Sequence, residues 1–312
     1  MMRISNHMWN DESWDKTSRM YFDPTFKETN DVDLETWDEI IAFLAERKFN
    51  MIVLDVGDGL EFDSHPEISA PDAWSKELLK QKIDEAKAVG IEIIPKLNFS
   101  TGHDTWLKEY RRMVSTPKYY EVCADLIAET CEAFGKPRLF HLGLDEEKAK
   151  TQRHHEMAII RHSKLYWHDV HFLFAECEKN GARPWIWSDM YWAVPEEFLA
   201  NVPKNVLISN WFYDVFRDDY EPGYYAHTRI KAYEELDRAG YEQIPTSACI
   251  RNNNNTRQTV AFAEDRLTPK LLKGFMSCPW TPTTKDTEYL LKWDADRLYL
   301  AREMYYPETL ED

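Results

Sequence analysis

The sequence predicts a single α/β domain over residues 1–312, folded as a (βα)₈ TIM barrel. Eight short runs are largely apolar, which is typical of strands buried in a parallel sheet. Helical stretches lie between and after these runs, and this repeated alternation favours a barrel over an open sheet. The length agrees, because such barrels take about 250 residues before loop insertions and this chain has 312.

The expected strands are the apolar runs themselves, and the first run is the least regular of them. They lie at Ile4–Met8, Met51–Val56, Ile91–Leu97, Leu139–Leu144, Trp185–Ser188, Val206–Ser209, Ile244–Cys249 and Phe275–Cys278. Because the runs are short and apolar on both faces, we expect each strand to be covered by helices on its outer side.

The expected helices are marked by their apolar faces and by their ends. One apolar face is formed by Leu34, Trp37, Ile40, Ile41 and Leu44. Thr116 and Pro117 form an N-cap and first-turn proline for a helix that runs to about Glu132, and a last helix is expected over Thr287–Met304. A glycine that stops a helix is expected at Gly90, Gly135, Gly181, Gly240 and Gly274, and Asn50 is expected to stop one more.

Composition excludes several classes of partner. The net charge of −17 argues against nucleic acid and against an anionic membrane surface, because both are bound through clustered Lys and Arg. No apolar stretch approaches the roughly 18 residues of a membrane span, and no signal-peptide pattern opens the chain. The five cysteines lack CxxC spacing, which indicates buried thiols in a reducing compartment. We therefore expect a soluble, cytoplasmic protein.

Polar and aromatic side chains follow the ends of the apolar runs. In a TIM barrel these ends meet on one face, where the active site lies. The residues there are Asn10, Asp11, Asp55, Asp58, Asn98, Gly102, His103, Asp145, Glu146, Asp189, Asn210, Trp211, Arg251, Asn252 and Trp280. Carboxylates suit acid–base chemistry, amides suit hydroxyl groups, and indoles suit the apolar face of a sugar ring. The combination indicates a carbohydrate site.

Two segments go beyond this general pattern. HLGLDEE at His141–Glu147 and IIPKLNFSTGH at Ile93–His103 resemble two signatures of the family 20 β-N-acetylhexosaminidases, a family of glycoside hydrolases. That family carries H-x-G-x-D-E after its fourth strand and I-x-P followed by G-H after its third. WIWSDMYW and ISNWFYD stand where the family has a W-x-D/E element and a later strand-end tryptophan. The resemblance runs in order through most of the barrel.

The resemblance implies a retaining exo-hydrolase that removes terminal N-acetylhexosamine, with the substrate's own acetamido group as nucleophile. Glu146 would be the general acid and then the base, and Asp145 would orient the acetamido group. His103 would bond to Glu146 and to a carboxylate after the second strand, for which Asp58 is preferred over Asp55. The resemblance implies a carbohydrate substrate and no cofactor.

The expected substrate-binding residues include two substitutions for family residues that this chain lacks. The family's arginine after the first strand is absent from HMWNDESW, so Asn10 or Asp11 would replace it. Tyr213 is assigned to the acetamido carbonyl, although it follows strand six where the family's tyrosine follows strand seven. The family's glutamate after the last tryptophan is also absent. The remaining expected contacts are His141, Trp187, Asp189, Trp211 and Trp280.

Other interpretations remain open on the sequence alone. A glycosidase for another sugar would use Asp189 or another carboxylate as nucleophile, with the two carboxylates about 5 Å apart. A carbohydrate-binding barrel without activity is a third possibility, and Asp145–Glu147 as a solvated acidic turn is the simplest alternative. No metal is expected, because the required spacings are absent at Asp55–Gly59 and among the histidines of the fourth helical region. Those histidines are His154, His155, His162, His168 and His171.

Overall fold

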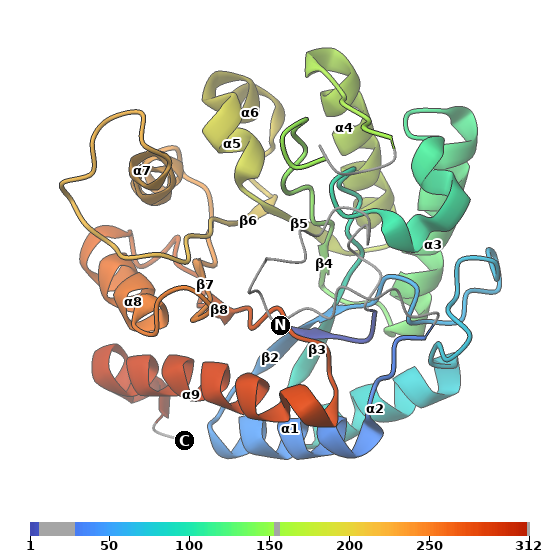
Figure 1. Ribbon diagram of the computed structural model, residues 1–312, viewed down its shortest axis with the longest axis horizontal. Helices are drawn as coiled ribbons and strands as arrows, with labels where there is room; N and C mark the ends of the chain where they lie inside the picture. Colours follow the sequence, from blue (N-terminus) through green and yellow to red (C-terminus); the bar gives the residue numbers. More distant parts are fainter. Residues whose placement is uncertain (6–28, 153–156, 311–312) are drawn as a thin grey trace.

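A computed structural model of the chain describes residues 1–5, 29–152 and 157–310, with parallel strands at the centre and helices around them (Figure 1). Six strands form one sheet in chain order, and two more form a parallel pair. The six are β1 (Met2–Arg3), β2 (Met51–Asp55), β3 (Glu92–Lys96), β4 (Leu139–His141), β5 (Arg183–Trp187) and β6 (Leu207–Ser209). The pair is β7 (Thr246–Ser247) and β8 (Met276–Ser277). Strand order and direction are those of a TIM-barrel-like α/β fold.

Hydrogen bonds join the six-stranded sheet to the pair on both sides. The amide of Ile244 donates to the Ile208 carbonyl at 2.9 Å, beside β6. On the other side, the amino group of Met1 donates to the Ser277 carbonyl at 2.7 Å. The carboxyl ends of the strands therefore face the same side of the molecule, and residues that follow them can meet there.

Helices cover the outside of the strands, as the short apolar runs require. The longer ones are α1 (Leu34–Glu46), α2 (Lys76–Ala88), α3 (Pro117–Ala133), α4 (Ser163–Lys179), α7 (Tyr225–Arg238), α8 (Asn255–Arg266) and α9 (Glu288–Tyr305). Short helices are α5 (Asp189–Ala193) and α6 (Pro195–Asn201), with 3₁₀ turns at Thr105–Arg112, Lys285–Thr287 and Pro307–Leu310. The predicted cap of α3 is confirmed, because Thr116 Oγ1 accepts from the Tyr119 amide at 3.3 Å and Pro117 opens the helix.

Side chains alternate between two cores along each strand. Trp185 and Trp187 point into the centre with Val53 and Ile94, whereas Ile186 between them packs outward against the helices. This alternation is the period-2 pattern of a strand with one face in the barrel interior and the other under helices. The outer core includes Trp37 of α1, which is buried.

Three expectations about the elements need correction. The first strand is Met2–Arg3 rather than Ile4–Met8, of which residues 6–8 lie outside the described part of the chain. Leu34 is not part of the apolar face of α1, because its side chain is 40% exposed at the helix start. Asn50 does not stop that helix; Lys48, with φ +54, takes the left-handed conformation instead. At Gly90 the prediction is confirmed, with φ +85 after α2.

The five cysteines are all free and buried, as expected for thiols outside disulfides. Among the described residues, no helix is long and apolar enough to cross a membrane. Neither observation identifies a compartment, so the cytoplasmic location stays a prediction.

Candidate functional site

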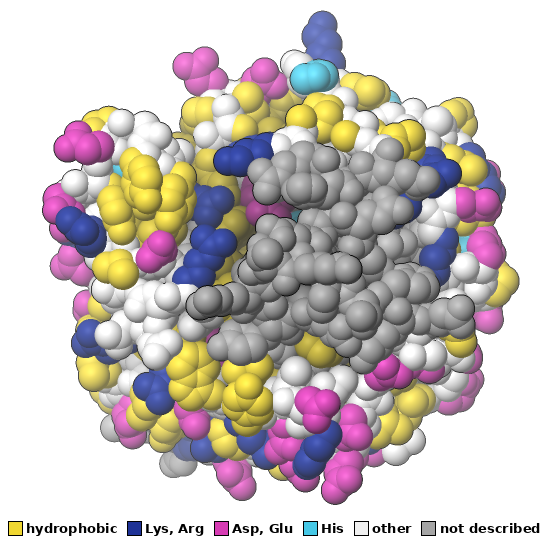
Figure 2. Space-filling view, viewed as in Figure 1, with side chains coloured by type: hydrophobic (Ala, Val, Ile, Leu, Met, Phe, Trp, Pro, Cys, Tyr) yellow, Lys and Arg dark blue, Asp and Glu magenta, His cyan; other side chains and the backbone are white. Residues whose placement is uncertain are grey.

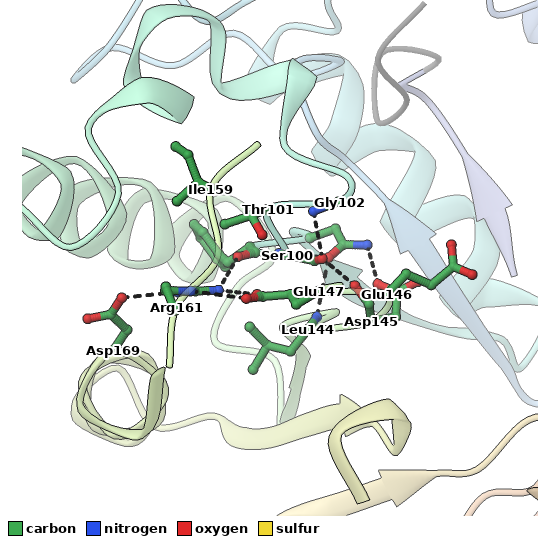
Figure 3. A network of polar contacts seen from close by, with 12 residues as sticks. Ser100, Thr101, Gly102, Leu144, Asp145, Glu146, Glu147, Ile159, Arg161 and Asp169 are labelled. Atoms are coloured by element: carbon green, nitrogen blue, oxygen red, sulfur yellow. Dashed lines mark hydrogen bonds and ion pairs between the residues drawn. The ribbon is translucent and has the colours of Figure 1, made fainter. Parts of the chain in front are cut away.

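The chain makes a strained turn where it leaves β4, and this turn carries Asp145 and Glu146 (Figure 3). Gly143, Leu144 and Glu146 have φ values of +71°, +68° and +56°. A Cβ at position 143 would lie 2.0 Å from Asn98 Oδ1, so glycine is needed there. Left-handed conformations cost non-glycine residues about 1–3 kcal/mol each and persist where the surroundings enforce them, often at functional sites. The turn is thus a first indication of a site.

Neighbouring strand ends hold this turn in place. From the segment after β3, Asn98 Nδ2 donates to Asp145 Oδ1 at 2.8 Å, and Ser100 Oγ donates to the Asp145 carbonyl. From the end of β5, Asp189 Oδ1 accepts from the Glu146 amide at 3.2 Å. The two acidic side chains therefore have fixed orientations, which chemistry at a defined atom requires.

His103 lies between the two carboxylates. Its Nε2 is 3.3 Å from Asp145 Oδ2 and 3.2 Å from Glu146 Oε2. The side chains of His103 and Asp145 are only 2% and 8% exposed, whereas that of Glu146 is 29% exposed. One carboxylate is thus enclosed and the other reaches toward solvent. A solvated acidic turn, the simplest alternative on the sequence, is wrong for Asp145.

The electrostatics favour a histidine cation beside an ionised Asp145. Burial alone would lower the pKa of His103, but Asp145 and Glu146 outweigh burial and raise this pKa to about 10. Burial alone would raise the pKa of Asp145, but His103, Lys96 and Asn98 hold this pKa below its ordinary value. Asp145 is therefore an anion, able to accept hydrogen bonds at neutral pH.

Replacing His103 by asparagine is expected to raise the pKa of Asp145, because asparagine supplies no positive charge to offset burial. NMR titration of ¹³C-labelled aspartate carboxyl groups would measure this pKa in both proteins. His171→Asn on α4 is the matched control, since His171 Nε2 contacts only the Asn201 carbonyl among the described hydrogen bonds. An unchanged pKa of Asp145 in the His103 variant would contradict the histidine cation.

Asp189 contacts the same turn, and both of its carboxylate oxygens accept a hydrogen bond. Its Oδ2 accepts from Trp211 Nε1 at 2.7 Å, while Oδ1 accepts from the Glu146 amide. Burial, followed by the nearby Asp145 and Glu146 charges, raises the pKa of Asp189 to about 7. Through these two hydrogen bonds, Asp189 fixes the positions of the Glu146 backbone and the Trp211 side chain.

A cavity of about 390 Å³ opens above the two carboxylates. It is lined by Asp145, Glu146, Lys150, Trp187, Trp211, Phe212, Tyr213, Asp214, Tyr225, Arg229, Ile250, Arg251 and Trp280. Trp211 stacks on Tyr213 with ring centroids 4.9 Å apart and planes inclined by 26°, and Trp187 lies 6.1 Å from Trp280. The lining combines flat aromatic faces with carboxylates and cations, which suits a ring-shaped polar ligand with apolar faces.

Most of the predicted site residues meet at this cavity. Asp145, Glu146, Trp187, Trp211, Tyr213 and Trp280 line it, while His103 and Asp189 lie directly behind them. His141 is buried below, where its Nδ1 accepts from the Gly143 amide at 3.0 Å and its ring packs against Trp187. A substrate contact for His141 stays a prediction. Asn10 and Asp11 lie outside the described residues.

The carboxylates at the end of β2 and after it, Asp55 and Asp58, have other described partners. Asp58 accepts from Ser5 Oγ at 2.6 Å and from Lys108 Nζ at 2.7 Å. Asp55 pairs with Lys96 at 2.7 Å inside the barrel, where both side chains are buried. The predicted link from His103 to Asp58, and the preference for Asp58 over Asp55, therefore stay predictions.

A buried ion network behind the turn was not predicted from the sequence. Arg161 pairs with Glu147 and, at 3.2 Å, with Asp169 of α4; these three side chains are 1%, 3% and 1% exposed (Figure 3). Arg161 Nη2 also donates to the Phe99 carbonyl at 3.4 Å. Through Arg161, Glu147 thereby connects the turn after β4 to α4 and to the segment after β3.

Arg229 of α7 is a second group that sequence reasoning missed. It lines the cavity, although nothing in its helical sequence context distinguishes it from a surface arginine. Arg251 was noted only as a strand-end residue, and Lys150 was not noted. Among the described residues, no group of three His, Cys, Asp or Glu side chains is arranged to hold a metal ion. The histidines at 154 and 155 lie outside the described residues.

Comparisons with known proteins identify the fold. No protein-family model matches the sequence, and neither does any curated protein. Solved structures do match: the GH20 β-N-acetylhexosaminidase of Streptomyces coelicolor A3(2) at TM-score 0.62 and 13% identity, over 89% of this chain and 67% of that one. The Flavobacterium johnsoniae chitobiase FjGH20 matches at TM-score 0.61 and 16% identity, over 90% of this chain and 48% of that one.

A third structure is the GH20 exo-β-N-acetylglucosaminidase of Vibrio harveyi in complex with N-acetylglucosamine, at TM-score 0.55 and 14% identity. The match covers 89% of this chain and 55% of the Vibrio protein. The chain thus spans about half the length of the Flavobacterium and Vibrio proteins. At such identities these likenesses establish a fold shared with GH20 structures, which confirms the resemblance found in the sequence at the level of fold.

Proposed function

We propose that the chain is a retaining exo-glycoside hydrolase that removes terminal β-linked N-acetylhexosamine. The observation that carries this proposal is the position of His103 Nε2 within 3.3 Å of both Asp145 and Glu146, at the base of an aromatic cavity. Two adjacent carboxylates with different exposure can take different roles. The proposed substrate is a carbohydrate, in line with the N-acetylglucosamine bound by the Vibrio harveyi neighbour.

In the first step, Glu146 protonates the glycosidic oxygen as the bond to the anomeric carbon breaks. The acetamido oxygen of the substrate attacks that carbon and forms an oxazolinium-like ring. Asp145, an anion beside His103, accepts the acetamido N–H and stabilises the positive charge that develops on the ring. In the second step, Glu146 takes a proton from water, the water oxygen opens the ring, and the sugar leaves with its configuration retained.

The aromatic lining supplies the proposed sugar contacts. Trp187, Trp211 and Trp280 would pack against the apolar faces of the pyranose, and Tyr213 would donate to the acetamido carbonyl. Tyr213 stacks on Trp211, which is itself bonded to Asp189, so the position of this wall is fixed before substrate arrives.

A double displacement with Asp189 as nucleophile is the main alternative, and the contacts of Asp189 count against it. Both of its oxygens already accept hydrogen bonds, from the Trp211 indole and from the Glu146 amide. Asp189 is also absent from the residues that line the cavity. The proposal therefore assigns the nucleophile to the substrate.

The proposal extends to the organisation of the chain. We take residues 1–312 as one catalytic domain with a closed (βα)₈ barrel, in which Asn10, His141 and Asp58 keep the roles expected from the sequence. The hydrogen bonds from Met1 to Ser277 and from Ile244 to Ile208 support closure on both sides of β7 and β8.

Chromogenic glycosides test the reaction directly. The wild type is expected to hydrolyse a 4-nitrophenyl N-acetyl-β-glucosaminide or its galacto epimer, and to leave the β-glucoside and β-galactoside without an acetamido group intact. The acetamido group is the proposed nucleophile, so its removal should abolish turnover. Turnover of the simple glycosides alone would contradict the proposal and assign the nucleophile to an enzyme carboxylate. Release of the β-anomer, observed by NMR, checks retention.

A further inference from the structure

Three cations gather in the cavity of a strongly acidic protein. The chain carries a net charge of −17, yet Lys150, Arg229 and Arg251 all line this one cavity. Figure 2 shows Lys and Arg side chains along one margin of the hollow on this face of the molecule. Within the described part of the chain, none of the three makes an ion pair, whereas about half of the other basic side chains there have a carboxylate partner. No described carboxylate therefore neutralises these three charges through an ion pair.

Aromatic rings fix the position of Arg229. Its guanidinium carbon lies 4.3 Å from the ring centroid of Trp211 and 4.4 Å from that of Trp192, with Tyr225 at 5.5 Å. Stacking of this kind holds the planar group while leaving its N–H donors free to bond an oxyanion. Arg229 is thus placed on the same tryptophan that we assign to the sugar wall.

Arg251 lies close enough to Arg229 for the two positive charges to repel each other. Burial lowers the pKa of Arg229, Asp189 and Glu146 act in the opposite direction, and Arg251 lowers this pKa by a smaller amount. A third cation, Lys150, extends the same lining, and a ligand with negative charge would relieve this repulsion. Of the three carboxylates in the lining, Asp145 and Glu146 both lie beside His103, and Asp214 accepts from Tyr225 at 3.0 Å.

We propose that Lys150, Arg229 and Arg251 form an anion subsite, and that the natural substrate carries a sulfate, phosphate or carboxylate group near the scissile bond. This inference rests on the proposed function. The charged group belongs either to the terminal N-acetylhexosamine or to the sugar that leaves, and both sources present the same oxyanion to the arginines. Arginine binds such groups through paired, charge-assisted hydrogen bonds.

Paired substrates test the subsite and separate the two sources. One pair is the 4-nitrophenyl N-acetyl-β-glucosaminide with and without a 6-O-sulfate. The other is N-acetylglucosamine β-linked to glucuronic acid or to glucose. We expect the charged member of at least one pair to have a kcat/KM roughly tenfold or more above its neutral partner, the size of a charge-assisted hydrogen bond. Equal values within both pairs would overturn the proposal.

Arg251→Gln is the informative variant, because Arg251 is exposed and has no described partner, so the fold should tolerate its loss. It is expected to reduce the preference for the charged substrate by roughly tenfold. Lys270→Gln makes the same change of charge at an exposed position before β8, at the amino ends of the strands, and should leave the preference unchanged. A preference retained in Arg251→Gln would overturn the proposal.

Binding distinguishes a failure of the subsite from a failure of the proposed reaction. If none of the substrates is hydrolysed, titration calorimetry with N-acetylglucosamine and its 6-sulfate, and with glucuronic acid and glucose, still reports on the cations. Tighter binding of an anionic sugar that is lost in Arg251→Gln would support the subsite without the reaction. Equal or absent binding of the charged and neutral sugars would overturn the subsite as well.

Discussion

Replacing Glu146 by glutamine is expected to lower kcat/KM for an alkyl N-acetyl-β-glucosaminide by about 10²–10⁴-fold, the usual contribution of a general acid. The leaving alkoxide needs a proton in the transition state, and glutamine has none to give. A 2,4-dinitrophenyl glycoside should lose less than about tenfold, because its phenolate leaves without protonation. Steady-state kinetics of both substrates with wild type and variant measures the difference.

Asp145→Asn provides the contrast for this experiment. It should lower kcat/KM for both substrates, because its proposed target, the acetamido group, attacks whatever the leaving group is. Glu196→Gln, on an exposed position of α6, is the matched control and should change neither value. An equal loss on both substrates in Glu146→Gln would contradict the assignment of Glu146 as the acid.

Local patterns predicted the positions of β2 to β8 and of the acidic pair after β4, because the deciding interactions lie within a few residues; the first strand was misplaced. The Thr116–Pro117 cap and the glycine stop at Gly90 depend only on backbone geometry. Asp145 and Glu146 were found because they follow a strand end in a specific motif. The strand-end rule then explained why Trp211 and Trp280 meet them, although long stretches of chain separate these residues.

Residues whose role depends on packing across the molecule could not be found this way. Arg229 lies in an ordinary helical sequence, and only the arrangement of α7 beside Trp192 and Trp211 brings it to the cavity. Leu34 fits the apolar period of α1 but lies exposed, because the period does not say where the covered face begins. The choice between Lys48 and Asn50 as the left-handed residue depends on how the chain enters β2.

Replacing Arg161 by methionine is expected to destabilise the protein by about 3–5 kcal/mol, the cost of leaving buried carboxylates without their partner. Glu147 should bear most of the loss, because Asp169 keeps hydrogen bonds from Ser115 and Tyr120, both at 2.5 Å. Urea unfolding measures this change. Arg138→Met removes an exposed arginine that pairs with Glu92 at 2.8 Å and should cost less than about 1 kcal/mol. A similarly small cost for Arg161→Met would contradict a structural role for the network.

The pH dependence of the stability of Arg161→Met tests whether Glu147 causes the loss of stability. Burial raises the pKa of Glu147 even beside Arg161, and removal of the arginine should raise it further. A carboxyl group with a raised pKa in the folded state binds its proton more tightly there, so stability falls as pH rises above its unfolded value of about 4.3. The variant should therefore lose stability more steeply than wild type between pH 5 and pH 8. Adding Glu147→Gln should remove that extra slope, because the buried charge is then gone at every pH. Loss of the extra slope in the double variant would show that Glu147 contributes to the site by holding the turn after β4 in place.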